Sequence, residues 1–329
     1  MKSTIILATN GKGLSRAERQ SQQWSVEYLL EKLDVRCLAA DPNNPQRVYA
    51  GTQGDGLLCS EDSGRTWRPC GLEGQIVKAI AVSPHQPGTI YAGVKPASLY
   101  ISRDGGRSWE QSAGFQRIPW RWWWFSPAEK PGQAYVQALA ISPTDPNVIL
   151  AGIEFGAVVR SQDGGLTWSS HRSGALRDCH DLKFHAANGD WVYEAGGSGG
   201  GASHSRDGGK TWRKMKQGLA KNYGVACAAD PAKPEVWYVS VAPSPNKAYG
   251  DQPEAYLYRS NGGADWNPIG WEQHPMGQMP IALVSERCEP GQIYAGLTNG
   301  DVWHSSDYGD SWEKLPLNLQ GIWRSMIVL

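Results

Sequence analysis

Short apolar runs with polar residues between them recur along the whole chain, and Gly, Pro and Asp residues punctuate them. In one stretch, an apolar run at 77–82 ends in a Ser-Pro turn, and further runs follow at 89–93 and 98–102. Trp109 then begins a fourth run. Alternating apolar positions over such short segments are typical of β-strands, and the turn residues indicate antiparallel connections. The pattern predicts units of four antiparallel strands.

An eight-residue signature follows the third strand of each unit. Its consensus is Ser-x-Asp-x-Gly-x-Thr/Ser-Trp, and roughly 40 to 60 residues separate successive copies, a spacing that indicates an array of small sheets. We expect the Asp to accept turn N–H groups, the Gly to adopt positive φ and the Trp to bury its ring. One carboxylate per turn is too few for a calcium cage, so we expect a structural role. The copies are 60–67, 102–109, 161–168, 205–212, 305–312 and a decayed one at 259–266.

The two ends of the chain together form one more unit. Residues 4–11 resemble 292–300, which is a second strand, and Trp24 occupies a fourth-strand position. The first strand that this unit lacks occurs at 323–328. Pairing that strand with the N-terminal unit closes the ring and leaves no exposed sheet edge there. The sequence therefore predicts an all-β fold, a seven-bladed β-propeller of four-stranded antiparallel blades closed by the C-terminal strand.

We expect a single domain at 1–329, because one repeat array runs from end to end. Blade 1 is predicted to combine 1–33 with 321–329. The other six blades are predicted at about 34–71, 75–112, 133–171, 178–216, 222–270 and 277–316.

The signature resembles the Asp-box, or BNR repeat, of sialidase-type propellers, and the resemblance covers almost the whole chain. Sialidases carry an Arg-Ile-Pro motif before the first Asp-box and build six blades, whereas here 117–119 follows the second Asp-box. Seven-bladed Asp-box rings resemble two other groups: xyloglucan-cleaving glycosidases, which use paired propellers, and photosystem II assembly factors, which bind partners through an Arg-rich patch. The resemblance implies either a glycosidase-like enzyme or a binding propeller.

Composition excludes several partners. Lys and Arg together number 32, as do Asp and Glu, so the chain has no net charge to attract nucleic acid. The longest early apolar run, at 5–8, is too short for a signal peptide or a membrane span. We expect a cytoplasmic protein with no nucleic-acid partner and no membrane span. The six cysteines lack zinc-ligand spacing, and we expect no metal and no other cofactor.

Alignment of the inner strands predicts one ring of polar side chains near the top face, where the blade-to-blade connections lie. Three cations and a histidine that converge there favour a carboxylate or phosphate ligand. The alternative is a set of separate ion pairs with Asp34, Asp178 and Asp181. The ring consists of Arg36, Lys78, Gln137, His180 and Arg324, with Val225 and Pro280 at the same position of the other two blades.

Two insertions are predicted on the same face, at 110–133 and 243–254. Contiguous exposed aromatic residues suit stacking on a sugar ring or contact with a partner. The alternative is that the first insertion folds over and plugs the channel. The candidate ligand-binding residues in these insertions are Arg117, Trp120, Trp122, Trp123, Trp124 and Tyr249.

Glu154 and Glu194 are the candidate catalytic acids, since glycoside hydrolysis commonly needs two carboxylates at a set separation. The histidines at the top connections, His171, His180 and His274, show no metal-ligand spacing. Two functions stay open. One is a propeller that binds an acidic sugar, another small anion or a protein partner on its top face, and the other is a glycoside hydrolase-like enzyme acting on an acidic or oligomeric glycan.

Overall fold

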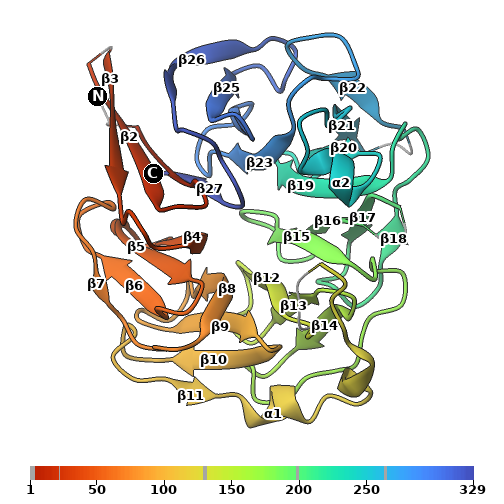
Figure 1. Ribbon diagram of the computed structural model, residues 1–329. Helices are drawn as coiled ribbons and strands as arrows, with labels where there is room; N and C mark the ends of the chain where they lie inside the picture. The colour runs from red at the N-terminus through yellow and green to blue at the C-terminus, as the bar shows by residue number, and fades with distance from the viewer. Residues whose placement is uncertain (1–3, 22, 129–131, 198–199, 263–264) are drawn as a thin grey trace.

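The computed structural model describes residues 4–21, 23–128, 132–197, 200–262 and 265–329. Seven antiparallel sheets stand around one central axis, as Figure 1 shows, and the two α-helices among the described residues are each four residues long. The prediction of an all-β, seven-bladed propeller is therefore confirmed.

The first blade contains both ends of the chain. Its sheet order is β27-β1-β2-β3, where β27 is Met326–Val328, β1 is Ile5–Thr9, β2 is Leu14–Gln20 and β3 is Gln23–Leu29. Ile327 pairs with Leu7 in an antiparallel register, and the Leu329 N–H donates to the Ile5 carbonyl at 2.9 Å. The predicted closure of the ring by the C-terminal strand is thus confirmed (Figure 1).

The other blades follow in chain order around the ring (Figure 1). Blade 4 has three regular strands among the described residues, but the Arg172 N–H donates to the Val158 carbonyl at 2.9 Å along its outer edge. Blades 2 and 3 are β4 (Val35–Asp41), β5 (Asn44–Thr52), β6 (Leu57–Ser60), β7 (Arg68–Pro69), and β8 (Ile76–Val82), β9 (Ile90–Lys95), β10 (Ser98–Ser102), β11 (Glu110–Gln111). Blades 4 and 5 are β12 (Val136–Ile141), β13 (Ile149–Ile153), β14 (Ala157–Ser161), and β15 (Cys179–Phe184), β16 (Val192–Gly196), β17 (Ala202–Ser205), β18 (Arg213–Lys214). Blades 6 and 7 are β19 (Tyr223–Ala229), β20 (Val236–Ala242), β21 (Tyr256–Asn261), β22 (Asn267–Ile269), and β23 (Pro280–Ser285), β24 (Ile293–Leu297), β25 (Asp301–Ser305), β26 (Glu313–Asn318).

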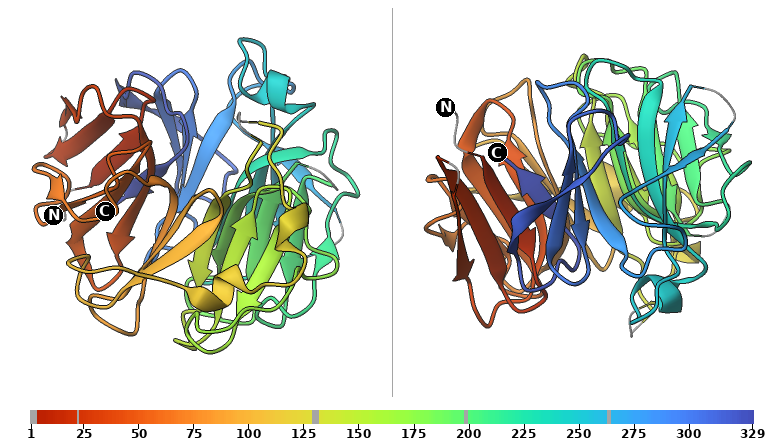
Figure 2. Two further views of the ribbon diagram at one scale, coloured as in Figure 1. Left: turned by 60° about the horizontal axis from the view of Figure 1, so that its bottom comes forward. Right: turned by 90° about the horizontal axis from the view of Figure 1, so that it is seen from above.

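The helical segments lie in the two predicted insertions. The first insertion contains α1 (Ala113–Gln116) and the 3₁₀ turn η1 (Arg121–Trp123), and α1 lies at the outer edge of the ring in Figure 1. The second contains α2 (Pro245–Ala248), which projects beyond one face of the ring in Figure 2. None of the helices in the described ranges has the length and apolar character needed to cross a membrane.

The Asp-box turns hold themselves together as the signature predicts. In the first copy, Asp62 Oδ1 accepts the Thr66 N–H at 2.9 Å and Oδ2 accepts the Thr66 hydroxyl at 2.6 Å. The Ser60 hydroxyl donates to Asp62 Oδ1 at 2.7 Å and accepts the Gly64 N–H at 2.9 Å. Gly64 has φ +80°, and its carbonyl accepts the Trp67 indole N–H at 3.0 Å. These contacts account for the whole signature without a ligand.

Small residues on the second strands let neighbouring blades approach closely. A Cβ added to Gly93 of β9 would lie 2.4 Å from Val136 of β12 in the next blade. A Cβ added to Gly51 of β5 would similarly lie 2.7 Å from Val77 of β8. These glycines therefore supply the space that the next inner strand fills.

Candidate functional site

A β-bulge near the top of the inner strands positions the ring of polar side chains. In β4, Val35 pairs with Thr52 and Cys37 pairs with Gly51, so Arg36 is left as the extra residue. The same irregularity occurs in all six inner strands that open a blade, and bulges of this kind re-aim a side chain. The extra residues are Arg36, Lys78, Gln137, His180, Val225 and Ile281, and all of them line the central channel.

Blade 7 departs from the predicted alignment. Pro280 pairs with Leu297, so Ile281 and not Pro280 occupies the bulge and lines the channel. Arg324 also lines the channel, just before β27. The remaining four polar positions lie where the alignment predicts.

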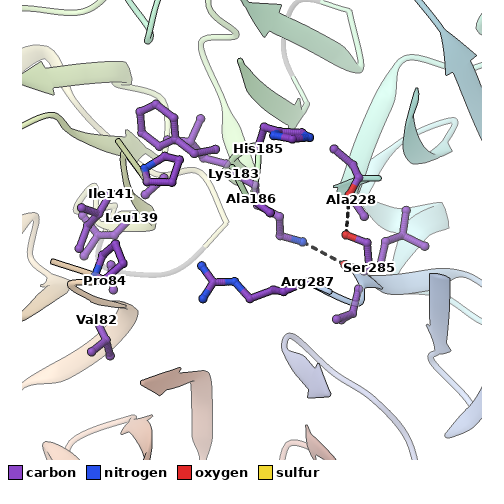
Figure 3. A pocket seen from close by; sticks show the side chains of 18 of the residues that line it. Val82, Pro84, Leu139, Ile141, Lys183, His185, Ala186, Ala228, Ser285 and Arg287 are labelled. Atoms are coloured by element: carbon purple, nitrogen blue, oxygen red, sulfur yellow. Dashed lines mark hydrogen bonds between the residues drawn. The ribbon is translucent and has the colours of Figure 1, made fainter. Parts of the chain in front are cut away.

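Three neighbouring cavities follow the axis of the ring. The middle cavity, of about 260 Å³, shares His180 and Arg324 with the upper one and Lys183 with the lower one. The upper cavity is the largest, at about 770 Å³. The lower cavity, of about 300 Å³, is lined mainly by apolar side chains and is shown in Figure 3.

The ammonium of Lys183, which lines the lower cavity, is held by groups of the protein itself. Lys183 lies 2.9 Å from Asp181, and its ammonium donates to the carbonyls of Cys227 at 2.6 Å and Leu283 at 3.0 Å. The Arg287 side chain reaches across the opening in Figure 3. Because protein groups already satisfy the ammonium of Lys183, this lysine is not open to a ligand in the lower cavity.

Loops and strand starts from several blades build the upper cavity. Glu154 and Phe155 come from the tight β13–β14 turn, Asp178 immediately precedes β15, and Tyr223 begins β19. The α2 insertion adds Tyr249, and the segment before β27 adds Trp323 and Arg324. The cavity thus combines aromatic walls with a small set of polar groups, as ligand sites commonly do.

The polar floor contains a compact cluster of Glu154, Asp178 and His180. One oxygen of each carboxylate and one ring nitrogen of His180 all lie within 4.8 Å of one another. Both acids are 4% exposed. His180 Nδ1 lies 2.6 Å from the Gly224 carbonyl, and Nε2 lies 3.3 Å from Asp178 Oδ2.

Charge and burial act on the pKa of His180 in opposite directions. Burial alone would lower the pKa of His180, but the carboxylates of Asp178 and Glu154 and the Gly224 carbonyl raise it on balance. Burial raises the pKa of Tyr223 and of Tyr249, which also hydrogen-bond each other. Both phenols therefore stay protonated near neutral pH, and one of them donates its proton to the other.

The cations of the ring are already engaged in part. Arg36 donates to Asp34 at 2.5 Å, and the Lys78 ammonium lies 4.6 Å from the centre of the Tyr135 ring. Two of the predicted ion pairs at the top of the ring, Arg36 with Asp34 and His180 with Asp178, are thus formed. Of the predicted cations, Arg324 is the one that lines the upper cavity itself.

The tryptophans of the first insertion lie toward the outer rim, whereas Pro127 and Ala128 of the same insertion line the upper cavity. Trp124 packs against Phe115 at 6.0 Å between ring centres, and Phe115 in turn meets the Asp-box residue Trp168. Exposed fractions of 65%, 69% and 63% characterise Trp120, Trp122 and Trp123. None of these four tryptophans lines the cavities described above, and Arg117 is exposed beside them.

Glu194 lies apart from the cavities, inside blade 5. It is 0% exposed, and its Oε2 accepts the Leu176 N–H at 2.9 Å. Burial raises its pKa to about 8, with the hydrogen bonds from Leu176 and other neighbours opposing that rise. Glu194 is therefore not among the groups that cluster with Glu154, and the carboxylate in that cluster is Asp178.

From the sequence, Asp178 is predicted only as an ion-pair partner, and neither Trp323 nor Tyr135 is predicted to line the site. The signal for Asp178 is its position directly before an inner strand, at the mouth of the ring. For Trp323 the comparable signal is its position just before the closing strand β27.

Comparison with known proteins supports the repeat and the fold. The BNR/Asp-box repeat family matches residues 100–111. Among curated proteins, none matches the chain by sequence. The chain is similar in structure to an ancestral GH74 enzyme, with a TM-score of 0.64 and 20% identity over 85% of this chain and 38% of that one. It thus spans about two fifths of that enzyme's length.

Two further solved structures share the fold. The GH74 enzyme of Niastella koreensis matches with a TM-score of 0.62 and 15% identity over 97% of this chain and 65% of that one. YCF48 bound to D1 peptide matches with a TM-score of 0.58 and 15% identity over 85% of this chain and 80% of that one. The chain is a seven-bladed propeller with BNR/Asp-box repeats, and its structural neighbours include both GH74 enzymes and YCF48.

Proposed function

We propose that this chain is a binding propeller and that its upper cavity holds an acidic ligand with a ring or apolar portion. The observation that carries the proposal is the cavity of about 770 Å³ with aromatic walls and polar groups converging on its floor. Arg324 would face the acidic group, because a guanidinium can bind a carboxylate or phosphate through two hydrogen bonds. Tyr223, Tyr249 and Trp323 would pack against the ring or apolar portion.

The ligand class follows from this lining. An acidic sugar supplies both a carboxylate and a flat ring face, and a peptide that ends in a free carboxylate and carries an apolar residue supplies the same two features. YCF48 bound to D1 peptide shows that a similarly folded propeller binds a peptide. Both ligand types share the chemistry proposed here, an anionic group next to an apolar surface.

The test is equilibrium binding of uronic-acid oligosaccharides and of short peptides with free C-terminal carboxylates. Arg324→Ala should weaken binding by about tenfold or more, since a hydrogen bond to a charged group contributes about 1.5–3 kcal/mol. Tyr249→Ala should also weaken binding, because it removes an aromatic side chain that packs against the ring or apolar portion. Trp122→Ala is the matched control, because this tryptophan lies outside the cavities and should leave binding unchanged. Loss of binding in Trp122→Ala with full binding in Arg324→Ala would move the site to the outer rim and overturn the proposal.

A second function, glycoside hydrolysis, is favoured by one observation. Glu154 and Asp178 have oxygens within 4.8 Å of each other, and retaining glycosidases hold their two carboxyl groups about 5–5.5 Å apart. In that reaction one carboxyl group protonates the leaving oxygen while the other attacks the sugar carbon. GH74 enzymes among the structural neighbours are compatible with this chemistry.

A mass-spectrometric turnover screen separates the two functions. Sialosides, uronic-acid oligosaccharides and xyloglucan fragments would be incubated with the protein and with its Glu154→Gln and Asp178→Asn variants. Turnover that both variants lose establishes an enzyme at the upper cavity. Binding without turnover across the panel leaves the binding function alone.

A further inference from the structure

We propose that Glu154, Asp178 and His180 form a binding site for a divalent transition metal ion of the Zn²⁺ class at the floor of the upper cavity. The site goes beyond ligand binding by the aromatic walls and does not depend on it. It also departs from the sequence prediction of no metal, because the three residues are brought together by the fold and not by a spacing motif.

The donor set suits such an ion. Zn²⁺ accepts imidazole nitrogen and carboxylate oxygen, and a mixed set of one nitrogen and two oxygens selects against purely oxygen-loving cations such as Mg²⁺. Bonds of about 2.1 Å require ligand atoms no more than about 4.2 Å apart. The three ligand atoms lie within 4.8 Å of one another before any ion binds, so modest side-chain rotation brings them to that distance.

A buried carboxylate oxygen at the site lacks a protein partner. Asp178 is 4% exposed, and its Oδ1 has no hydrogen-bond partner within the described part of the chain. An unpartnered buried acceptor costs free energy, which a bound cation would recover. Since Asp178 lines the cavity, this oxygen is the observation that points to a ligand.

The surroundings hold the ligands in place. His180 Nδ1 lies 2.6 Å from the Gly224 carbonyl, so the Nδ1–H tautomer leaves the Nε2 lone pair for a metal. The Asp178 backbone is fixed as well, because its carbonyl accepts the Gly197 N–H at 2.9 Å. A Cβ added to Gly197 would lie 2.2 Å from Asp178 Oδ2, so the glycine is what leaves room for this carboxylate.

Three protein ligands leave at least one coordination position open toward the cavity. That arrangement is the one found in metal sites that bind an exogenous molecule. A cation here would also offset the two acids on the cavity floor, which otherwise repel an anionic ligand. The metal site and the proposed acidic ligand are therefore compatible with each other.

The test is a Zn²⁺ titration of the full chain after treatment with a chelator, read by calorimetry and by metal content after dialysis. One Zn²⁺ per chain is expected, and His180→Gln and Asp178→Asn should each weaken binding at least tenfold. His304→Gln is the matched control, since His304 pairs with Glu313 at 3.0 Å outside the upper cavity, and it should bind as the parent does. Co²⁺ should give a visible absorption band that the same two variants lose.

Several outcomes overturn the proposal. Absence of stoichiometric Zn²⁺ binding does so, as does equal binding by the parent and by folded His180→Gln and Asp178→Asn proteins. If either variant fails to fold, the Zn²⁺ titration is repeated with Glu154→Gln, because Glu154 lies on a separate turn and its replacement does not disturb β15. Equal Zn²⁺ binding by that variant and the parent then overturns the proposal. Binding of the uronic-acid oligosaccharides and peptides (the acidic panel) is also measured in the presence of a chelator, which keeps the two proposals apart. If these ligands bind but Zn²⁺ does not, the metal site is wrong and the binding function stands.

Discussion

Single residues decide how tightly the blades pack. Gly93 faces Val136 of the next blade so closely that Gly93→Ala would create a 2.4 Å contact. Overpacking of this kind costs about 1–3 kcal/mol, and we expect a loss of that size in the free energy of unfolding measured by denaturant titration. Gly277 has no heavy atom within 4 Å of an added Cβ, so Gly277→Ala serves as the control and should change stability little. Equal effects of the two substitutions would contradict the packing account.

The Asp-box carboxylates make the stability of the fold depend on pH at the acidic end. Hydrogen bonds from the side chain and backbone of Ser311 lower the pKa of Asp307 to about 2. Because the folded pKa lies below the unfolded value of about 3.9, this group stabilises the fold above pH 4 and loses that contribution as the pH falls toward 2. Thermal melting from pH 6 to pH 2 should show a smaller acid-induced drop for Asp307→Asn than for the parent, together with lower stability at pH 6. Parallel curves would mean that this carboxylate does not contribute.

At the scale of elements, the tryptophan insertion divides into an anchor and an exposed surface. Trp124 packs on Phe115, whereas the Trp122 side chain is 69% exposed. Trp124→Ala should therefore cost about 2–4 kcal/mol of unfolding free energy, and Trp122→Ala should cost well under 1 kcal/mol. Denaturant titration of both variants checks this, and an equal loss in both would show that the insertion packs differently.

The closing strand is the element on which ring integrity depends most. Deleting 321–329 removes β27 from β1 and the backbone bonds to Thr9, among them the Trp323 N–H to the Thr9 carbonyl at 2.8 Å. We expect aggregation or a loss on the order of 3–5 kcal/mol, because β1 would be left with an unpaired edge. Light scattering and thermal melting report both effects. A truncated protein that stays monomeric and melts within about 2 °C of the parent would contradict closure by this strand.

The sequence pattern predicts the strands and blades well but predicts the residues of the site only in part. The alternation, the Asp-boxes and the terminal half-units predict the blades and their closure, because each depends on local spacing that repeats. The inner-strand alignment also finds Arg36, Lys78 and His180, since the bulge recurs at one position.

What the sequence missed depends on non-local geometry. Glu194 and Glu154 both belong to the tops of second strands, yet Glu194 turns into blade 5 and Asp178 takes the place beside Glu154. The tryptophan insertion leaves its blade toward the outer rim because Phe115 and Trp124 find an apolar surface there. Neither outcome follows from residue spacing, since each is set by which neighbouring blade offers space.

On the scale of the whole molecule, the ring brings groups from distant parts of the chain together in the upper cavity. The upper cavity draws residues from blades 4 to 6, from the insertion before blade 4 and from the closing segment, so no single blade contains it. Loops on a rigid scaffold can change their residues without disturbing the core, which is why a structural Asp-box array can serve both binding and catalysis.

The most direct test of the central claim is hydrogen–deuterium exchange with and without the tightest-binding member of the acidic panel. The account predicts slower exchange confined to the segments around Glu154, His180, Tyr223, Tyr249 and Arg324, which come from distant parts of the chain and all meet at the upper cavity. Protection confined to 117–125 on the outer rim, with unchanged exchange in those five segments, would contradict it.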